Sequence, residues 1–230
     1  MPLNKLKVIG FDADDTLWVN ETYFRESEDT FFQLMSGFAS KDDLSGELLT
    51  TEIANLELYG YGVKAFVLSM LETALHVAGN DLPVQTIGQI IELGRHQLNK
   101  PVELLQNTKK ALETLSHKYK LIVITKGDLL DQERKLQKSG LLEYFHHIEV
   151  VSEKTPEEYQ KIMRLLDIEP SEFAMIGNSL KSDILPVLAC GSIGVHIPFH
   201  STWVDEQVDV TITDANFYHF EDIIDILTVF

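Results

Sequence analysis

Side chains capable of chemistry stand directly after short apolar runs in this sequence. Asp12 and Asp14 follow the first run, Thr125 ends the second, and Lys154 and Asp183 follow two later ones. Crowded carboxylates repel each other unless a hard cation neutralises them, and oxygen ligands with open positions suit Mg²⁺. One carboxylate could then attack a phosphorus atom, forming an aspartyl-phosphate, while the other serves as acid and base.

The spacing of these residues suggests which chemical role each of them has. Asp12 and Asp14 lie two residues apart, so their side chains would share one face of extended backbone, unless the turn bends that relation. Thr125 and Lys154 would hold phosphoryl oxygens, and Asp183 would complete a metal site. Lys126 competes with Lys154 for the phosphate, and Lys154 is favoured because it precedes a predicted helix N-terminus, where amides attract anions.

The apolar runs themselves predict a parallel sheet. They are short, rich in Val and Ile, and without helical periodicity, which is typical of buried strands. Helical patterns separate them, so we expect a doubly wound α/β fold in which the side chains named above meet beyond the carboxyl ends of the strands. The predicted strands are residues 7–11, 120–125, 148–151, 172–177, 192–196 and, as an alternating edge strand, 208–212.

The helices between these strands are marked by periodicity and by caps. A stripe of apolar residues predicts a helix over 102–118. Thr155, Pro156 and Glu158 form a capping-box pattern that opens another helix, which ends before Pro170.

One long region lacks any strand signal. Residues 19–101 show only helix-like segments, such as 24–38 and 65–77, and are too many for one crossover helix. We therefore predict an α/β core formed by residues 1–18 and 102–230, with a small helical domain inserted at 19–101.

Four motifs in this order resemble those of the haloacid dehalogenase superfamily, whose members are mostly phosphatases. The first is FDADDTL at residues 11–17, with the pattern DxDxT, and the second ends at Thr125. The third is Lys154, followed by Pro156, and the fourth is GNSLKSD at 177–183. The inserted helices coincide with the cap that many members carry between the first two motifs.

This resemblance implies roles for individual residues. Asp12 would be the nucleophile and Asp14 the acid and base, with Mg²⁺ as cofactor. The metal would be held by Asp12, the main-chain carbonyl of Asp14, Asp183 and Asn178, the last directly or through water. The sequence departs from the family pattern at Asp15, where Gly is usual, and at Asn178, where an acidic residue is common.

The leading hypothesis is a phosphomonoesterase acting on a small phosphorylated metabolite. Phosphoglucomutase-like phosphoryl transfer uses the same motifs and stays open. A haloacid dehalogenase is disfavoured by Asp14, which those relatives lack, and a non-catalytic phospho-acceptor by the motif order and the inserted helices. The segment Tyr59–Gly62, with two aromatics and two glycines, fits either a loop that closes over substrate or a plain turn.

Composition excludes other classes of protein. With 36 acidic and 19 basic residues the chain carries a formal charge of −17, which disfavours nucleic acid as a partner. The single cysteine, Cys190, rules out an intrachain disulfide and a thiolate zinc cluster. We find no bilayer-spanning apolar stretch and no signal-peptide pattern, so we expect a cytoplasmic protein without membrane partners. The physiological substrate and the oligomeric state are not indicated by the sequence.

Overall fold

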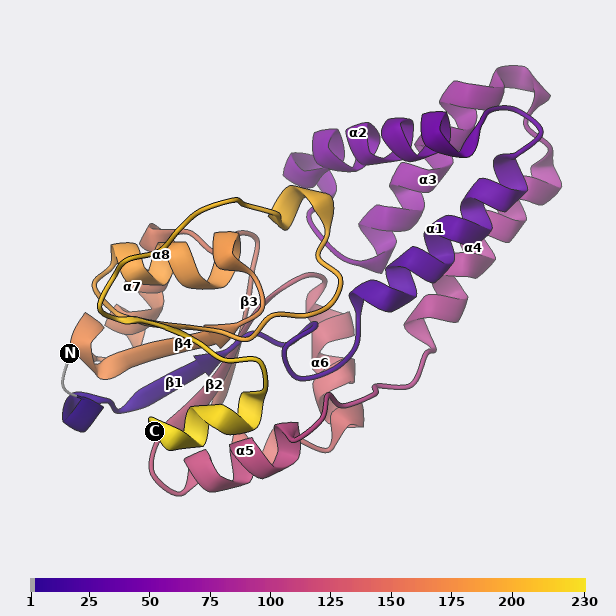
Figure 1. Cartoon of the computed structure of the whole chain (residues 1–230). Helices are drawn as coiled ribbons and strands as arrows, with labels where there is room; N and C mark the ends of the chain where they lie inside the picture. Colours follow the sequence, from indigo (N-terminus) through magenta and orange to yellow (C-terminus); the bar gives the residue numbers. More distant parts are fainter. Residues whose placement is uncertain (1–2) are drawn as a thin grey trace. The chain divides into compact units, whose positions relative to one another are not determined.

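The computed structural model describes residues 3–230, which divide into two compact units (Figure 1). The α/β unit comprises the chain up to Glu21 together with Val102–Lys126 and Gln132–Phe230. The helical unit comprises Thr22–Pro101 and Gly127–Asp131. The helical unit therefore interrupts the α/β unit in the sequence, in the region where we predicted inserted helices.

A six-stranded parallel sheet forms the centre of the α/β unit. Within the described residues its strand order is β3-β2-β1-β4-β5-β6, so the chain starts in the middle and extends to both sides. The predicted doubly wound parallel sheet is thus confirmed. The strands are β1 (Val8–Phe11), β2 (Lys120–Lys126), β3 (His147–Val151), β4 (Phe173–Gly177), β5 (Ile193–His196) and β6 (Phe217–His219).

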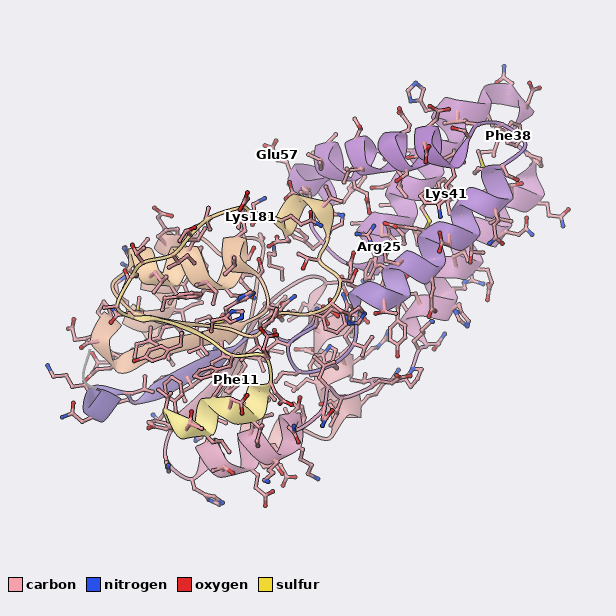
Figure 2. The ribbon with its side chains drawn as sticks, viewed as in Figure 1. Phe11, Arg25, Phe38, Lys41, Glu57 and Lys181 are labelled. Carbon is pink, nitrogen blue, oxygen red and sulfur yellow. The ribbon has the colours of Figure 1, made fainter. Side chains whose placement is uncertain are left out.

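Helices cover both faces of this sheet because alternate strand residues point to opposite sides. One face packs against α5 (Thr108–Ser116), α6 (Leu129–Ser139) and the 3₁₀ segment η7 (Ile223–Thr228), and Figure 2 shows Phe11 in this layer. The other face packs against α7 (Pro156–Leu165) and α8 (Leu185–Ala189). In β1, for example, Ile9 and Phe11 belong to the first layer and Val8 to the second.

The edge strand was predicted at the wrong place. Residues 208–212 alternate Val, Thr and Ile with Asp, yet they form no strand, and Val210 is 44% exposed. The sixth strand is β6, in which Tyr218 pairs with Val195 and packs against the core of the first layer. The segment that pairs with β5 is the one that buries an aromatic side chain against the core. The alternation of residues 208–212 gives no information about such burial.

The helix predicted over 102–118 is also shorter than expected: α5 begins only at Thr108 and ends at Ser116. The preceding backbone pairs with the segment that follows β1: Leu105 donates to the carbonyl of Leu17, and Val19 donates to that of Glu103. Asn107 then takes a left-handed conformation with φ +64° before the helix starts. The predicted start of α7 is confirmed, since Thr155 accepts the N–H of Glu158 at 3.3 Å and Pro156 is its first residue.

The helical unit has its own apolar core. Side chains from four helices meet there: α1 (Glu21–Met35), α2 (Lys41–Tyr59), α3 (Val63–Ala78) and α4 (Val84–Leu98). On its surface, Lys41 pairs with Asp29 at 2.8 Å and Arg25 with Glu28 at 2.8 Å (Figure 2). Gly60 and Gly62, with φ of +67° and +103°, form the turn between α2 and α3.

None of the helices among residues 3–230 is long and apolar enough to cross a membrane.

Candidate active site

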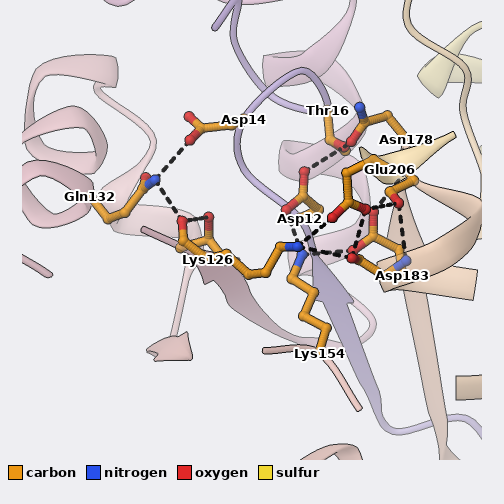
Figure 3. Close-up of polar contacts among 12 residues, drawn as sticks. Asp12, Asp14, Thr16, Lys126, Gln132, Lys154, Asn178, Asp183 and Glu206 are labelled. Carbon is orange, nitrogen blue, oxygen red and sulfur yellow. Dashed lines mark hydrogen bonds and ion pairs between the residues drawn. The ribbon is translucent and has the colours of Figure 1, made fainter. Parts of the chain in front are cut away.

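Lys154 joins two carboxylates at the carboxyl edge of the sheet (Figure 3). Its Nζ lies 2.5 Å from Oδ1 of Asp12 and 2.6 Å from Oδ1 of Asp183. All three side chains are almost fully buried. They come from segments that follow β1, β3 and β4, which are distant in sequence but end at one edge of the sheet. The sequence prediction that these three residues gather is therefore met by the geometry.

Backbone geometry fixes where the two carboxylates stand. The N–H of Asp12 donates to the carbonyl of Ile176 at 2.9 Å and so continues the pairing of β1 with β4. Asp183 folds back over the end of β4, where its Oδ2 accepts the N–H of Ser179 at 3.0 Å. A Cβ at Gly177 would lie 2.2 Å from that Oδ2, so only glycine leaves room for the Asp183 carboxylate.

Burial and charge set the ionisation of this group. Burial raises the pKa of Asp12, Lys154 lowers it and Asp183 raises it again, which together bring it to about 7. Burial alone would lower the pKa of Lys154, but the charges of Asp12 and Asp183 outweigh it and raise that pKa above its usual range. Lys154 therefore stays a cation, and its charge favours the ionised form of Asp12.

The oxygen atoms around Asp12 fit a magnesium ion. Thr16 donates its hydroxyl to Oδ2 of Asp12 at 3.0 Å, and the same hydroxyl lies 3.3 Å from Oδ1 of Asn178. Asp12 and Asn178 share the Thr16 hydroxyl, and Asp12 and Asp183 share the Lys154 ammonium, so Asp183 and Asn178 add hard oxygen atoms on either side of Asp12. Among residues 3–230 no three His, Cys, Asp or Glu side chains form a ready metal cage, but Mg²⁺ commonly uses one or two carboxylates, several waters and a substrate phosphate.

The Asp14 side chain does not share a face with Asp12. Figure 3 shows its carboxylate pointing away from Asp12 and toward Gln132. Its Oδ1 accepts the indole N–H of Trp18 at 2.7 Å, and its Oδ2 accepts the amide of Gln132 at 2.7 Å. The expected shared face assumed extended backbone, whereas the chain turns directly after β1. The family-based role of the Asp14 main-chain carbonyl is independent of this side-chain orientation.

Asp15 acts as a buried cap for the chain that follows. Its carboxylate accepts the N–H groups of Asn20 at 2.8 Å and Glu21 at 2.9 Å, where α1 begins. Its φ of +63° lies in the left-handed region, which explains why glycine suits this position. Burial, with the nearby charge of Asp14, raises the pKa of Asp15 to about 8. Asp15 is thus a buried residue that caps the start of α1.

Thr125, predicted to hold phosphate, and Lys126, the competing candidate for the phosphate-binding lysine, have different surroundings. Thr125 is buried at the end of β2, and its hydroxyl lies 3.2 Å from the carbonyl of Lys126. The Lys126 ammonium lies 2.5 Å from Oε1 of Glu206 and 3.1 Å from the hydroxyl of Ser182. Lys126 thus belongs to the network at this edge, but Lys154 is the lysine that contacts Asp12.

Glu206 is a site residue that sequence reasoning missed. It lies in the long segment between β5 and β6, and its Oε2 accepts the hydroxyls of Ser179 at 2.5 Å and Ser182 at 2.7 Å. Ser179 therefore contacts both Asp183, through its N–H, and Glu206, through its hydroxyl. No motif or spacing in the sequence marks Glu206, because only the path of this segment brings it to the site.

Comparison with known proteins agrees with this geometry. The model of the haloacid dehalogenase-like hydrolases matches residues 6–191, which is most of the chain. The chain belongs to this family. It is a hydrolase by family, and the resemblance stated from the four motifs is confirmed.

Individual relatives extend the comparison over nearly the whole chain. A haloacid dehalogenase-like family hydrolase from Xanthomonas campestris is 36% identical, with a TM-score of 0.89 over 98% of this chain and 90% of that one. The glyceraldehyde 3-phosphate phosphatase of Methanopyrus kandleri is 25% identical over 203 residues, 84% of each chain. The N-acylneuraminate-9-phosphatase of Rattus norvegicus is 25% identical over 122 residues, 51% of this chain and 47% of that protein.

Proposed function

We propose that this hydrolase is a Mg²⁺-dependent phosphomonoesterase that works through an aspartyl-phosphate on Asp12. The observation that carries the proposal is the pair of contacts from Lys154 to Asp12 and Asp183 at 2.5 and 2.6 Å. A buried carboxylate beside a buried cation suits attack on an anionic phosphorus centre, because the cation favours the ionised nucleophile and attracts the phosphoryl oxygens.

The chain's residues would act in two steps. In the first, an Asp12 oxygen bonds to phosphorus, the bond from phosphorus to the ester oxygen breaks, and Asp14 gives that oxygen a proton. In the second, water attacks the phosphorus, Asp14 takes the water's proton, and the bond to Asp12 breaks, so that phosphate leaves and Asp12 is restored. Thr125 and Lys154 would hold phosphoryl oxygens throughout.

The metal ion would be held by Asp12, Asp183, the main-chain carbonyl of Asp14 and Asn178, the last directly or through water. When bound, Mg²⁺ would neutralise phosphoryl charge in this crowded acidic site. The helical unit is proposed as the cap that excludes water while the first step proceeds, as its insertion between β1 and β2 suggests.

The proposed substrate is a small phosphorylated metabolite. The two phosphatases compared above are named for glyceraldehyde 3-phosphate and for the 9-phosphate of an N-acylneuraminate, and this supports a small phosphate ester as substrate here. A screen of phosphate release from sugar phosphates, phosphoglycolate and nucleotides would identify the leaving group.

The direct test uses p-nitrophenyl phosphate with Mg²⁺. We expect turnover by the wild type, its loss on removal of Mg²⁺ with a chelator, and its abolition in Asp12→Asn, which keeps the size of the side chain but removes the nucleophile. Asp209→Asn, the same change at an exposed position, is the matched control and should retain activity. Turnover by Asp12→Asn comparable to that of the wild type would refute the mechanism.

A further inference from the structure

The carboxylate of Asp14 is held by side-chain donors on both of its oxygens. Lys135 Nζ lies 2.9 Å from Oδ1 and 3.1 Å from Oδ2. The indole of Trp18 donates to Oδ1 at 2.7 Å, and the amide of Gln132 donates to Oδ2 at 2.7 Å. We call these three donors, Trp18, Gln132 and Lys135, the Asp14 seat. All of them belong to the α/β unit.

The seat holds the Asp14 carboxylate away from Asp12. Each of its oxygens accepts from two donor atoms, and Figure 3 shows the carboxylate turned toward Gln132. To reach a leaving oxygen or a water molecule beside Asp12, the Asp14 side chain has to leave the seat and turn toward Asp12.

The seat is itself anchored by neighbouring groups. Lys135 also donates to Oδ1 of Asn20 at 2.8 Å, and the backbone N–H of Asn20 is held by Asp15. Gln132 also donates to the carbonyl of Lys126 at 3.0 Å, at the end of β2. Gln132 and Lys135 lie three residues apart on α6, so they project from one face of the helix. Lys135 and Gln132 therefore each have a hydrogen-bond partner besides Asp14.

We propose that Lys135 is a positioning residue that keeps Asp14 in a resting position, and that Asp14 must leave Lys135 before it can transfer a proton. The inference rests on the proposed phosphatase function and concerns the acid and base of the same reaction. It assigns a role to a lysine that no motif identifies. It also accounts for the orientation of Asp14 away from Asp12 in Figure 3.

This arrangement makes a prediction about leaving groups. An interaction made in the resting state and lost in the transition state slows the reaction, so its removal speeds the step that needs Asp14. An alkyl ester needs a proton on its departing oxygen, whereas p-nitrophenolate departs without one. Removal of Lys135 should therefore favour alkyl esters over p-nitrophenyl phosphate. The ratio of kcat/KM for the two substrates cancels any common effect on phosphate binding.

The experiment compares benzyl phosphate, an alkyl ester of similar size, with p-nitrophenyl phosphate in the full-length protein with Mg²⁺. In Lys135→Met the benzyl to p-nitrophenyl ratio of kcat/KM should rise about two- to fivefold, the range expected for a partly exposed ion pair. Lys135→Arg retains the cation and should keep the wild-type ratio. Lys138→Met, at an exposed position on the same helix, is the matched control and should also keep it.

A second comparison tests whether Lys135 acts through Asp14. In an Asp14→Asn background, adding Lys135→Met should leave the ratio where Asp14→Asn alone puts it. A lysine that changed the ratio by a route other than Asp14 would shift both backgrounds alike. If Lys135→Met does not fold, Gln132→Met removes a different donor of the seat and should raise the ratio in the same direction by about twofold.

The outcomes separate this inference from the proposed function. An unchanged or lowered ratio in an active Lys135→Met, or the same rise in Lys138→Met, would overturn the role of Lys135 while leaving the phosphatase intact. A wild type that releases no phosphate from p-nitrophenyl phosphate would instead refute the proposed function itself.

Discussion

Glu206, which belongs to none of the four motifs, accepts three side-chain hydrogen bonds at the site. Its carboxylate contacts Lys126, Ser179 and Ser182 and is only 12% exposed. Burial alone would raise the pKa of Glu206, but the charge of Lys126 and the hydrogen bonds from all three partners outweigh it and lower the pKa from 4.5 to about 2. A carboxyl group with a depressed pKa stabilises the folded state above its unfolded pKa and loses that effect as the pH falls through its folded pKa.

This linkage predicts a pH-dependent stability for one substitution. Glu206→Gln should reduce the free energy of unfolding by about 1.5–3 kcal/mol at pH 7, because it replaces a charge-assisted network by neutral contacts. The difference from the wild type should shrink as the pH falls from 4.5 toward 2. Urea unfolding at pH 7, 4 and 3 measures it. Glu113→Gln, at an exposed position on α5, should differ by less than about 0.5 kcal/mol throughout.

Single residues also show how far sequence reasoning reaches. Asp12, Lys154 and Asp183 could be predicted to meet because each follows a strand, and parallel strands end at one edge. The orientation of Asp14 and the cap formed by Asp15 depend on turn dihedrals that the residue types do not determine. The turn at Asp15, with φ +63°, is one that a side chain rarely adopts.

Elements were predictable where burial on both faces leaves a continuous apolar run. The central strands β1, β2 and β4 are buried along nearly their whole length, and their predicted ends lie within a residue of the observed ones. The edge strand β6 was not predictable in this way. Residues 208–212 show the alternation of an edge strand, but the segment that pairs with β5 is Phe217–His219. Alternation along the sequence does not show which segment finds a neighbouring strand in the folded chain.

The junction between β4 and the helical turn that follows it depends on a missing side chain. Gly177 ends β4, and the Asp183 carboxylate lies where a Cβ would stand, 2.2 Å from its Oδ2. Gly177→Ala must therefore displace Asp183 from Lys154. We expect a loss of about 1–3 kcal/mol in the free energy of unfolding, the usual range for overpacking. If Mg²⁺ binds the wild type as proposed, it should raise the melting temperature of the wild type. This rise should disappear in Gly177→Ala, because the proposed ligand Asp183 is displaced.

Gly194 on the neighbouring strand β5 provides a matched control. A Cβ there would lie 3.1 Å from Cγ2 of Ile184, a contact with an apolar side chain rather than with a proposed metal ligand. Gly194→Ala should therefore lower stability without removing the effect of Mg²⁺ on the melting temperature. If Gly177→Ala kept a wild-type response to Mg²⁺, the assignment of Asp183 to the metal would be wrong.

At the scale of the whole molecule, few of the acidic residues are tied to the proposed chemistry. The chain carries a formal charge of −17, and the proposed reaction uses the side chains of Asp12, Asp14 and Asp183. One bound Mg²⁺ would remove only two negative charges. The field around the protein is therefore negative, and it repels an approaching phosphate ester at long range. Attraction has to come from local cations, of which Lys154 and the proposed metal are the nearest to Asp12.

This division between a repulsive long-range field and a local cationic site predicts the salt dependence of the reaction. Salt screens charges separated by more than about 10 Å at 0.1 M, so it weakens the repulsion at long range far more than the contacts inside a buried site. With Mg²⁺ saturating, kcat/KM for a small phosphate ester should stay level or rise as NaCl increases from about 0.02 to 0.5 M. A neutral osmolyte at equal osmolarity controls for solvent effects. A fall of about tenfold or more in kcat/KM would mean that the surface charge attracts the substrate at long range, as in proteins whose association is driven by opposite charge. Positive charge near the site would then extend well beyond Lys154.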